Sequence, residues 1–376
     1  MDVTYLDHNA SSPLSEELLG ELPGLAQRCR GNASSLHQFG RQSRRLISEA
    51  TAGVARFIHC DEDQIYWTSG ASEANTWALH SAAAQAIKAG RRPQFLVSAL
   101  EHDSTWLAAR SLGETHVIRA LPSGLIDLDH LKTCLSAHSA DLVSIVHANN
   151  ETGVIQELNE IGALCAAAHV PLHLDCAQTL GKVSLNFEVS GISYATFSAH
   201  KIAGPTGVGF LIAQAPPSPL ISGKQQRSRR GGTENALGVA LTGRAIELLL
   251  QQSPAFPESL RQWQQEFEAA IKRTIPGSLI HGAAAPRLHN TTFVGFEGVT
   301  GDGILINLDL EGICASSGSA CSSGTLNPSQ VLQAMGCSDA LARSSVRFSS
   351  GRTTRWSDFE RVLKVLPGIV ERARTT

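Results

Sequence analysis

A lysine in the middle of the chain stands where its amine can act as a nucleophile. The segment from Ser198 through His200 and Lys201 follows an apolar run and leads into a turn rich in glycine at 204–209. Burial at the end of a strand lowers the pKa of a lysine, and a neutral amine forms a Schiff base with a carbonyl group. A surface lysine beside a helix cap is the alternative, so a partner motif is needed.

An aspartate followed by a glutamine supplies that partner motif. The apolar run at 172–174 ends in Asp175, and Gln178 follows three positions later. A carboxylate at such a strand end can keep a pyridine nitrogen protonated, which makes pyridoxal phosphate an electron sink, and the glutamine can hydrogen-bond the ring oxygen. Lys201 and Asp175 at successive strand ends therefore suit this cofactor, although Asp175 is also a candidate helix N-cap.

This cofactor also needs a phosphate site, and the stretch 68–73 suits one. Ala71 and Ser72 are small residues at the start of an alanine-rich helical segment. Backbone amides and the helix dipole at such an end attract an anion. Ser72 is equally a candidate helix cap, so the motif gains weight only beside the lysine and the aspartate.

Further polar residues follow or lie within expected strands. His102 comes after the apolar run at 95–99, where an imidazole can stack on a planar cofactor and move protons. Asn150, in the polar cluster 147–153, suits a hydrogen bond to a ring hydroxyl or a substrate carboxylate, and Arg347 is a candidate carboxylate fork. A structural histidine, an Asx turn and a surface arginine are the corresponding alternatives.

A metal site is the weaker interpretation of the histidines near Asp175. His173 and Asp175 share a strand face, but Cys176 would point away from it, and His169 adds no recognisable ligand spacing. The sequence contains neither an HExxH motif nor paired CxxC motifs. We therefore expect no metal at this site.

One cysteine stands in a loop of small residues near the C-terminal end. Nothing in the segment 315–324 around Cys321 is bulky or apolar enough to fix it against a core. We expect this loop to be mobile and exposed, so that its thiol can act as a nucleophile. Cys314 follows an expected strand and is interpreted as structural, and a disulfide between the two is disfavoured in a reducing cell.

Alternating helical periodicity and short apolar runs from about residue 40 to 250 predict an α/β fold with a mostly parallel sheet. Helices are expected near 47–57 and 72–86, and buried strands at 95–97, 142–146, 172–174, 195–197 and 208–212. Ligands bind at the carboxyl ends of the strands in such sheets. We place a large domain at residues 15–255, and a smaller C-terminal domain at 1–14 and 256–376 that carries the Cys321 loop.

The composition excludes several classes of protein. With 31 Lys+Arg against 34 Asp+Glu the formal net charge is −3, so direct contact with nucleic acid or an anionic membrane is not expected. No run approaches the roughly 18 apolar residues of a membrane span, and the N-terminus is acidic where a signal peptide needs cations. The 8 cysteines lack the density of a secreted disulfide framework. We therefore expect a cytoplasmic protein with reduced cysteines.

Taken together, these motifs resemble those of the cysteine desulfurases of the NifS/IscS-like group, within the class V aminotransferase family of fold-type I pyridoxal phosphate enzymes. The resemblance covers nearly the whole chain in order, through segments at 6–13, 68–73, 101–102, 147–153, 175–178, 198–209, 229–235 and 316–321. It implies that family's fold, in which helices flank a mostly parallel seven-stranded sheet in a large domain and a smaller α+β domain follows.

The resemblance also implies roles for the matching residues. Lys201 would form the Schiff base, Asp175 would pair with the pyridine nitrogen, Gln178 would contact the ring hydroxyl, and His102 would stack on the ring and move protons. The phosphate would be held by Ala71, Ser72, Ser198 and His200, joined by Thr233 from a neighbouring subunit, which implies a homodimer.

For the substrate, the resemblance implies a binding site and a nucleophile. Asn150 and Arg347 would bind the carboxylate of L-cysteine. Cys321 would attack the sulfur of the substrate, keep that sulfur as a persulfide and release L-alanine. The sulfur would then pass to an acceptor protein.

Which acceptor that is stays open, because the sequence ends at Thr376, before the tail that IscS-like members use to meet an iron–sulfur scaffold. An iron–sulfur scaffold and an enzyme that thiolates tRNA or DNA are both candidates. Two other functions compete with desulfuration. One is a class V aminotransferase or lyase that does not use Cys321, and the other is a cofactor-binding sulfur-relay or regulatory protein without turnover.

Overall fold

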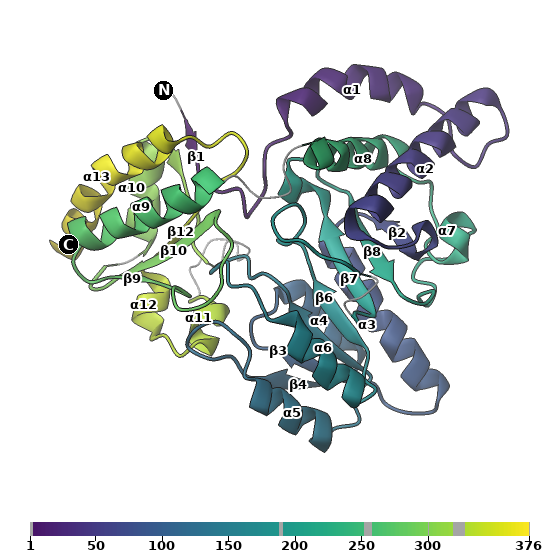
Figure 1. Cartoon of the computed structure of the whole chain (residues 1–376), viewed down its shortest axis with the longest axis horizontal. Helices are drawn as coiled ribbons and strands as arrows, with labels where there is room; N and C mark the ends of the chain where they lie inside the picture. The colour runs from purple at the N-terminus through teal and green to yellow at the C-terminus, as the bar shows by residue number, and fades with distance from the viewer. Residues whose placement is uncertain (1–2, 188–190, 252–257, 300, 319–327, 376) are drawn as a thin grey trace.

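A mostly parallel sheet forms the centre of the larger part of the molecule (Figure 1). The computed structural model describes residues 3–187, 191–251, 258–299, 301–318 and 328–375. In this described part of the chain the sheet has seven strands, in the order β2 (Ile65–Thr68), β8 (Gly209–Ala213), β7 (Tyr194–Ser198), β6 (Leu172–Asp175), β5 (Leu142–Val146), β3 (Gln94–Ser98) and β4 (Glu114–Ile118). β8 runs antiparallel to β2 and β7, and the other neighbours are parallel. The predicted fold class is confirmed.

Helices cover both faces of this sheet because its strands are apolar on both sides. Along β3, Leu96 packs toward one layer of core residues, while Phe95 and Val97 pack toward the other, as the two-residue period of a strand requires. The first layer contains α1 (Glu16–Arg28), α2 (Gln38–Ile58), α5 (Leu128–Ala137), α6 (Leu158–Ala167) and α8 (Ala236–Gln251). The second contains α3 (Ala71–Lys88) and α4 (Asp103–Leu112).

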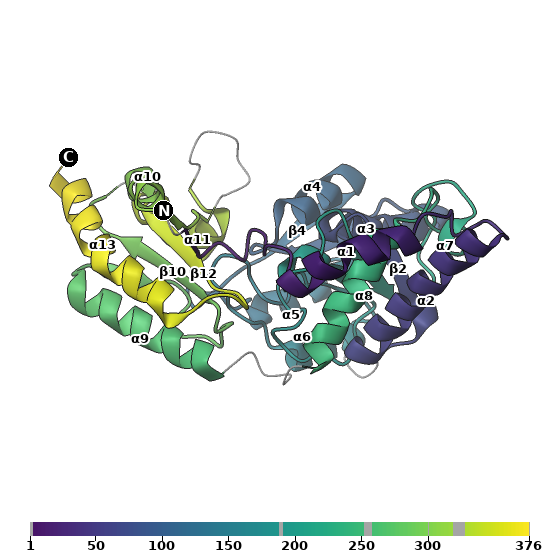
Figure 2. The same cartoon turned by 90° about the horizontal axis from the view of Figure 1, so that it is seen from above.

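Smaller sheets lie beside this unit (Figures 1 and 2), and a separate apolar core forms around them. β10 (Thr291–Phe296) pairs antiparallel with β9 (Ser278–Ile280) and β12 (Ser345–Ser349), and β1 (Thr4–Tyr5) pairs parallel with β11 (Ile313–Cys314). Their core is closed by α9 (Glu258–Thr274), α10 (Gly301–Leu310) and α13 (Trp356–Thr375). The short helices are η1 (Glu62–Gln64), η2 (Ala199–Ile202), α7 (Gln225–Ser228), α11 (Gln330–Ala334) and α12 (Asp339–Arg343).

No single position in the sequence separates the residues of the larger core from those of the smaller core. Leu6 belongs to the smaller core, whereas Val331 and Leu332 of α11 pack in the larger one. The boundary predicted at residue 255 falls within 252–257, outside the described residues, so that division stays a prediction.

The two edge strands of the large sheet, β2 and β4, are not among the strands predicted from apolar runs, and β4 has the least apolar sequence. It lies at the edge of the sheet and reads Glu-Thr-His-Val-Ile, with Ile118 as its fully buried residue. An edge strand has a partly solvated face, so its sequence need not be apolar throughout. Among the described residues, no helix is both long enough and apolar enough to cross a bilayer.

Candidate active site

A cavity of about 550 Å³ lies at the carboxyl ends of the central strands. Side chains from the N-terminal segment, the large sheet and its helices, and β12 line it together. The predicted site residues in its wall are Ala71, Ser72, His102, Asn150, Asp175, Gln178, Ser198, His200, Lys201 and Arg347. Thr233 is exposed and is not part of this wall, and Cys321 lies outside the described residues.

Asp175 ends β6, is 4% exposed, and has both carboxylate oxygens engaged. Oδ1 accepts a hydrogen bond of 2.9 Å from the backbone amide of Ala177, and Oδ2 accepts one of 2.8 Å from Nδ2 of Asn75. Turns and no helix follow Asp175, so the helix-cap alternative is wrong and the contact with Ala177 is that of an Asx turn. Asn75, from the facing helix α3, fixes the carboxylate plane toward the cavity.

His102 is connected to this aspartate through side chains. Asn75 Nδ2 also donates to Ser104 Oγ at 3.1 Å, and that hydroxyl lies 2.8 Å from His102 Nδ1. The backbone amide of Ser104 donates to the same Nδ1 at 3.1 Å, so in a neutral ring the proton is assigned to Nε2. His102 therefore caps α4 and also lines the cavity, so a structural role does not exclude a role at the site.

Lys201 projects from the short helix η2, directly after β7. Its Nζ donates to the backbone carbonyl oxygens of Asn9, at 2.6 Å, and Ala10, at 2.8 Å. Gln178 Nε2 donates to the same Asn9 carbonyl at 2.9 Å. The N-terminal segment thus crosses the cavity and holds the amine beside the glutamine.

The start of α3 offers backbone amides to an anion. The N-cap of α3 is Gly70 and not Ser72. Among the described residues no side chain forms a capping hydrogen bond there, so the first backbone amides are left for a ligand. A Cβ on Gly209 would lie 2.6 Å from Gly70 Cα, so the close approach of these backbones requires glycine. Ser198, 3% exposed, and His200 stand beside this helix end. Burial, with the nearby lysines, lowers the pKa of His200 to about 4.

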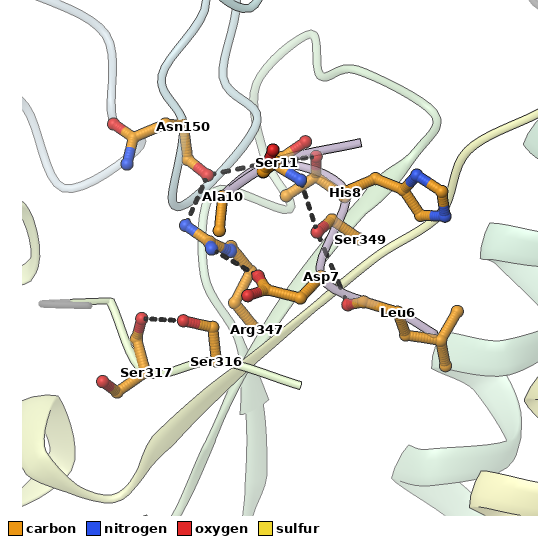
Figure 3. Close-up of polar contacts among 12 residues, drawn as sticks. Leu6, Asp7, His8, Ala10, Ser11, Asn150, Ser316, Ser317, Arg347 and Ser349 are labelled. Carbon is orange, nitrogen blue, oxygen red and sulfur yellow. Dashed lines mark hydrogen bonds and ion pairs between the residues drawn. The ribbon is translucent and has the colours of Figure 1, made fainter. Parts of the chain in front are cut away.

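Arg347 is 2% exposed, which contradicts the surface-arginine alternative. One terminal nitrogen lies 2.8 Å from Asp7 Oδ1, and the other donates to the backbone carbonyl of Asn150 at 3.1 Å (Figure 3). Among the described residues its Nε is buried and has no hydrogen-bond partner. A buried guanidinium with an unused donor suits a carboxylate ligand.

Comparison with known proteins identifies the family that combines these features. The model of the aminotransferase class-V family matches residues 4–362. This chain belongs to the class V aminotransferase family. The match covers most of the chain and includes every described site residue named above.

Individual relatives of this class V aminotransferase confirm the resemblance found in the sequence. A cysteine desulfurase from Nostoc sp. is 36% identical over 381 residues, which cover 100% of this chain and 94% of the relative. The structure of a NifS-like protein from Rickettsia africae ESF-5 aligns with a TM-score of 0.89 at 30% identity, over 98% of this chain and 100% of its own. SspA, solved in complex with cysteine, aligns with a TM-score of 0.79 at 27% identity, over 92% of this chain and 98% of its own.

Glu101, the neighbour of His102, is a buried carboxyl next to the site of this class V aminotransferase that the sequence reasoning did not single out. It is 6% exposed, and its Oε1 accepts from the backbone amide of Val146. Its Oε2 is buried without a hydrogen-bond partner in the described part of the chain. Burial, and then the charge of Asp175, raises the pKa of Glu101 well above its ordinary value. A raised pKa favours the neutral form of Glu101 beside Asp175.

Glu151 is a second buried carboxyl that the sequence did not single out. It is 8% exposed and accepts a hydrogen bond from Ser329 Oγ. It also lies against Gly318, where an added Cβ would be 2.3 Å from Glu151 Oε2. Burial outweighs the Ser329 hydrogen bond and the charge of Arg347, and raises the pKa of Glu151 to about 7.

We expect Glu151→Gln to change how stability depends on pH. Ionisation in the unfolded chain begins near the ordinary value of 4.5, whereas the folded protein keeps this proton up to about 7. Between these values the folded state binds more protons, so the free energy of unfolding falls as pH rises, by about 3 kcal/mol in all. Glutamine does not ionise, so the melting temperature of the variant should rise relative to wild type between about pH 5 and pH 8.

The matched control is Glu266→Gln, on the exposed side of α9, which should follow the wild-type profile. Melting curves at a series of pH values give the comparison directly. A constant difference between Glu151→Gln and wild type across this range would contradict the shifted pKa.

Proposed function

We propose that this class V aminotransferase is a cysteine desulfurase that converts L-cysteine to L-alanine and holds the released sulfur as a persulfide on Cys321. One observation carries the proposal. A single cavity brings together an amine, a buried carboxylate, the uncapped start of a helix and a buried arginine, in a chain similar over its full length to a cysteine desulfurase.

The residues of the cavity fit pyridoxal phosphate, on which class V aminotransferases depend. When bound, this cofactor withdraws electrons from the substrate and so allows a bond next to the amino-bearing carbon to break. Lys201 would present its amine to the cofactor aldehyde, and Asp175, which Asn75 orients, would keep the pyridine nitrogen protonated. Gln178 would donate to the ring hydroxyl, and His102 would hold the ring.

The phosphate group fits the start of α3. Backbone amides at Ala71 and Ser72 and the hydroxyl of Ser198 would hold it, and neutral His200 can donate a hydrogen bond. Thr233 would complete this site from a second copy of the chain, as its exposed position outside the cavity allows. The homodimer stays a prediction.

The substrate carboxylate is assigned to Arg347 and Asn150. The unpaired Nε of Arg347 gives a carboxylate a charged donor in a buried setting. In a neutral ring His102 carries its proton on Nε2, so it could first donate that proton at the site and then take one back.

Sulfur transfer then requires a thiolate. The Cys321 thiolate attacks the sulfur of the bound cysteine, so that an S–S bond forms and the C–S bond breaks. The electron pair of the broken bond stays on the carbon side, where protonation yields L-alanine. The persulfide sulfur passes to an acceptor, for which an iron–sulfur scaffold and a tRNA- or DNA-thiolating enzyme are both candidates. The cytoplasmic location also stays a prediction.

The test is product analysis with the cofactor-loaded enzyme and L-cysteine. Without a reductant, alanine and protein-bound persulfide should appear in equal amounts and then stop. With a thiol reductant, alanine and sulfide should form continuously, because the reductant removes the persulfide sulfur. Pyruvate and ammonia in place of alanine would instead indicate a lyase, and alanine without protein-bound sulfur would exclude the persulfide route.

A further inference from the structure

A second lysine lies directly behind the site. Lys182 comes 4 residues after Gln178, and its Nζ donates a hydrogen bond to Gln178 Oε1 at 2.7 Å. Lys182 lines a neighbouring cavity of about 430 Å³, whose wall it shares with Lys201 and His8. Gln178, 3% exposed, separates Lys182 from the 550 Å³ cavity.

The contact with Lys182 decides which end of the glutamine amide faces the site. A side-chain amide has an acceptor end and a donor end of nearly the same shape, so only its partners distinguish them. The lysine nitrogen carries N–H donors in both of its protonation states, and it donates one of them to Oε1. The backbone carbonyl of Asn9 is an acceptor and takes one hydrogen of Nε2, at 2.9 Å. The second Nε2 hydrogen is left for a group in the cavity.

We propose that Lys182 is a positioning residue, which holds the oxygen end of Gln178 so that the nitrogen end donates to the ring oxygen of pyridoxal phosphate. The inference rests on the proposed function, since it needs the cofactor in the 550 Å³ cavity. Without Lys182, only the Asn9 carbonyl still holds the amide in this orientation, so Oε1 should turn toward the ring oxygen in a larger share of the molecules. Two acceptors would then face each other, and the hydrogen bond would be lost.

The surroundings of Lys182 are consistent with a specific contact rather than a general ion pair. Burial, together with the charges of Lys201 and Arg347, lowers the pKa of Lys182 to about 7. Burial also lowers the pKa values of the nearby His8 and His200 to about 4, so neither adds charge at neutral pH. Glu16 and Glu17 of α1 stand at the opposite wall of the smaller cavity. The hydrogen bond to Gln178 Oε1 is thus a specific short-range contact of the Lys182 side chain.

The test follows the visible absorption of the cofactor-loaded enzyme against pH, without substrate. A donor at the ring oxygen withdraws negative charge from it, so this oxygen holds the proton of the neighbouring Lys201 nitrogen less strongly. Lys182→Met should therefore raise the midpoint pH of the spectral change by about one unit. Lys182→Arg keeps a donor and should restore most of the wild-type midpoint. Lys132→Met, on the exposed side of α5, is the matched control and should leave the midpoint unchanged.

A double-mutant cycle separates this role from a simple effect of charge. If Lys182 acts through the glutamine, Lys182→Met should shift the midpoint in the wild-type background and should have no further effect in Gln178→Ala. Gln178→Glu can bind Lys182 but has no donor for the ring, so it should shift the midpoint in the same direction. This variant gives an independent test if Lys182→Met folds poorly. An equal shift in both backgrounds, or no shift from Lys182→Met, would overturn the inference. Absence of any cofactor band in the wild type would overturn the proposed function instead.

Discussion

Lys201→Ala should abolish the covalent attachment of pyridoxal phosphate and lower alanine formation by about a thousandfold or more. The amine of Lys201 is held within the cavity by the carbonyl oxygens of Asn9 and Ala10. Alanine retains the backbone of η2 but has no group to link to the cofactor or to move protons. The phosphate and ring contacts are untouched, so the variant should still bind the cofactor noncovalently.

Borohydride reduction locates the link directly. Hydride adds to the C=N bond between lysine and cofactor, and peptide mass analysis then identifies the modified residue. The wild type should carry the modification on Lys201, and the exposed Lys132→Ala should behave as the wild type does. Modification of Lys182, which borders the neighbouring cavity with Lys201, would show that the assignment chose the wrong lysine. So would full turnover in Lys201→Ala.

Much of the large sheet was predictable because its buried strands carry their signal locally. Apolar runs located β3, β5, β6, β7 and β8, and the chemistry was expected at their ends. Asp175 and the start of η2 meet there because β6 and β7 are parallel neighbours, with Asp175 opposite Thr196. Parallel pairing brings carboxyl ends to one edge whatever the intervening sequence.

The contacts that orient the site were not predictable from the same patterns. Asn75 lies near the start of an alanine-rich helix, and it reaches Asp175, 100 positions away in the sequence. Asn9 bonds Gln178 and Lys201 through its backbone carbonyl, a group that every residue possesses and that no motif can mark. Such long-range contacts depend on how helices and the N-terminal segment pack, and hydrophobic periodicity does not specify that packing.

Lys182 and Arg347 illustrate a related limit. The spacing of Gln178 and Lys182 suggests a contact, but only the fold shows that Lys182 stands behind the cavity rather than in solvent. For Arg347, the alternating pattern of a strand predicts which face the side chain is on, but not which other segment buries it. The segment around Asp7, which is far away in the sequence, packs against Arg347 and buries it.

The cysteines that the structure describes are poor candidates for the nucleophile. The seven that the structure describes are free thiols, and burial raises the pKa of each of them. Cys176 is the one beside Asp175, and it is fully buried with its pKa well above the ordinary value. A thiol held protonated is a poor nucleophile. Cys321 lies outside the described residues, so its assignment depends on the sequence motif and on this contrast with the others.

Cys321→Ser should therefore reduce alanine formation from L-cysteine by at least about 100-fold and remove the protein-bound persulfide. Serine preserves the size of the side chain but gives a far weaker nucleophile, while the cofactor band should be unchanged because the cavity residues are intact. Cys314→Ser is the matched control, since Cys314 lies on β11 and its thiol pKa is raised by burial and by Asp309 and Asp7. It should retain wild-type turnover. Persulfide labelling and alanine measurement on both variants decide the assignment, and turnover that survives in Cys321→Ser but fails in Cys314→Ser would reverse it.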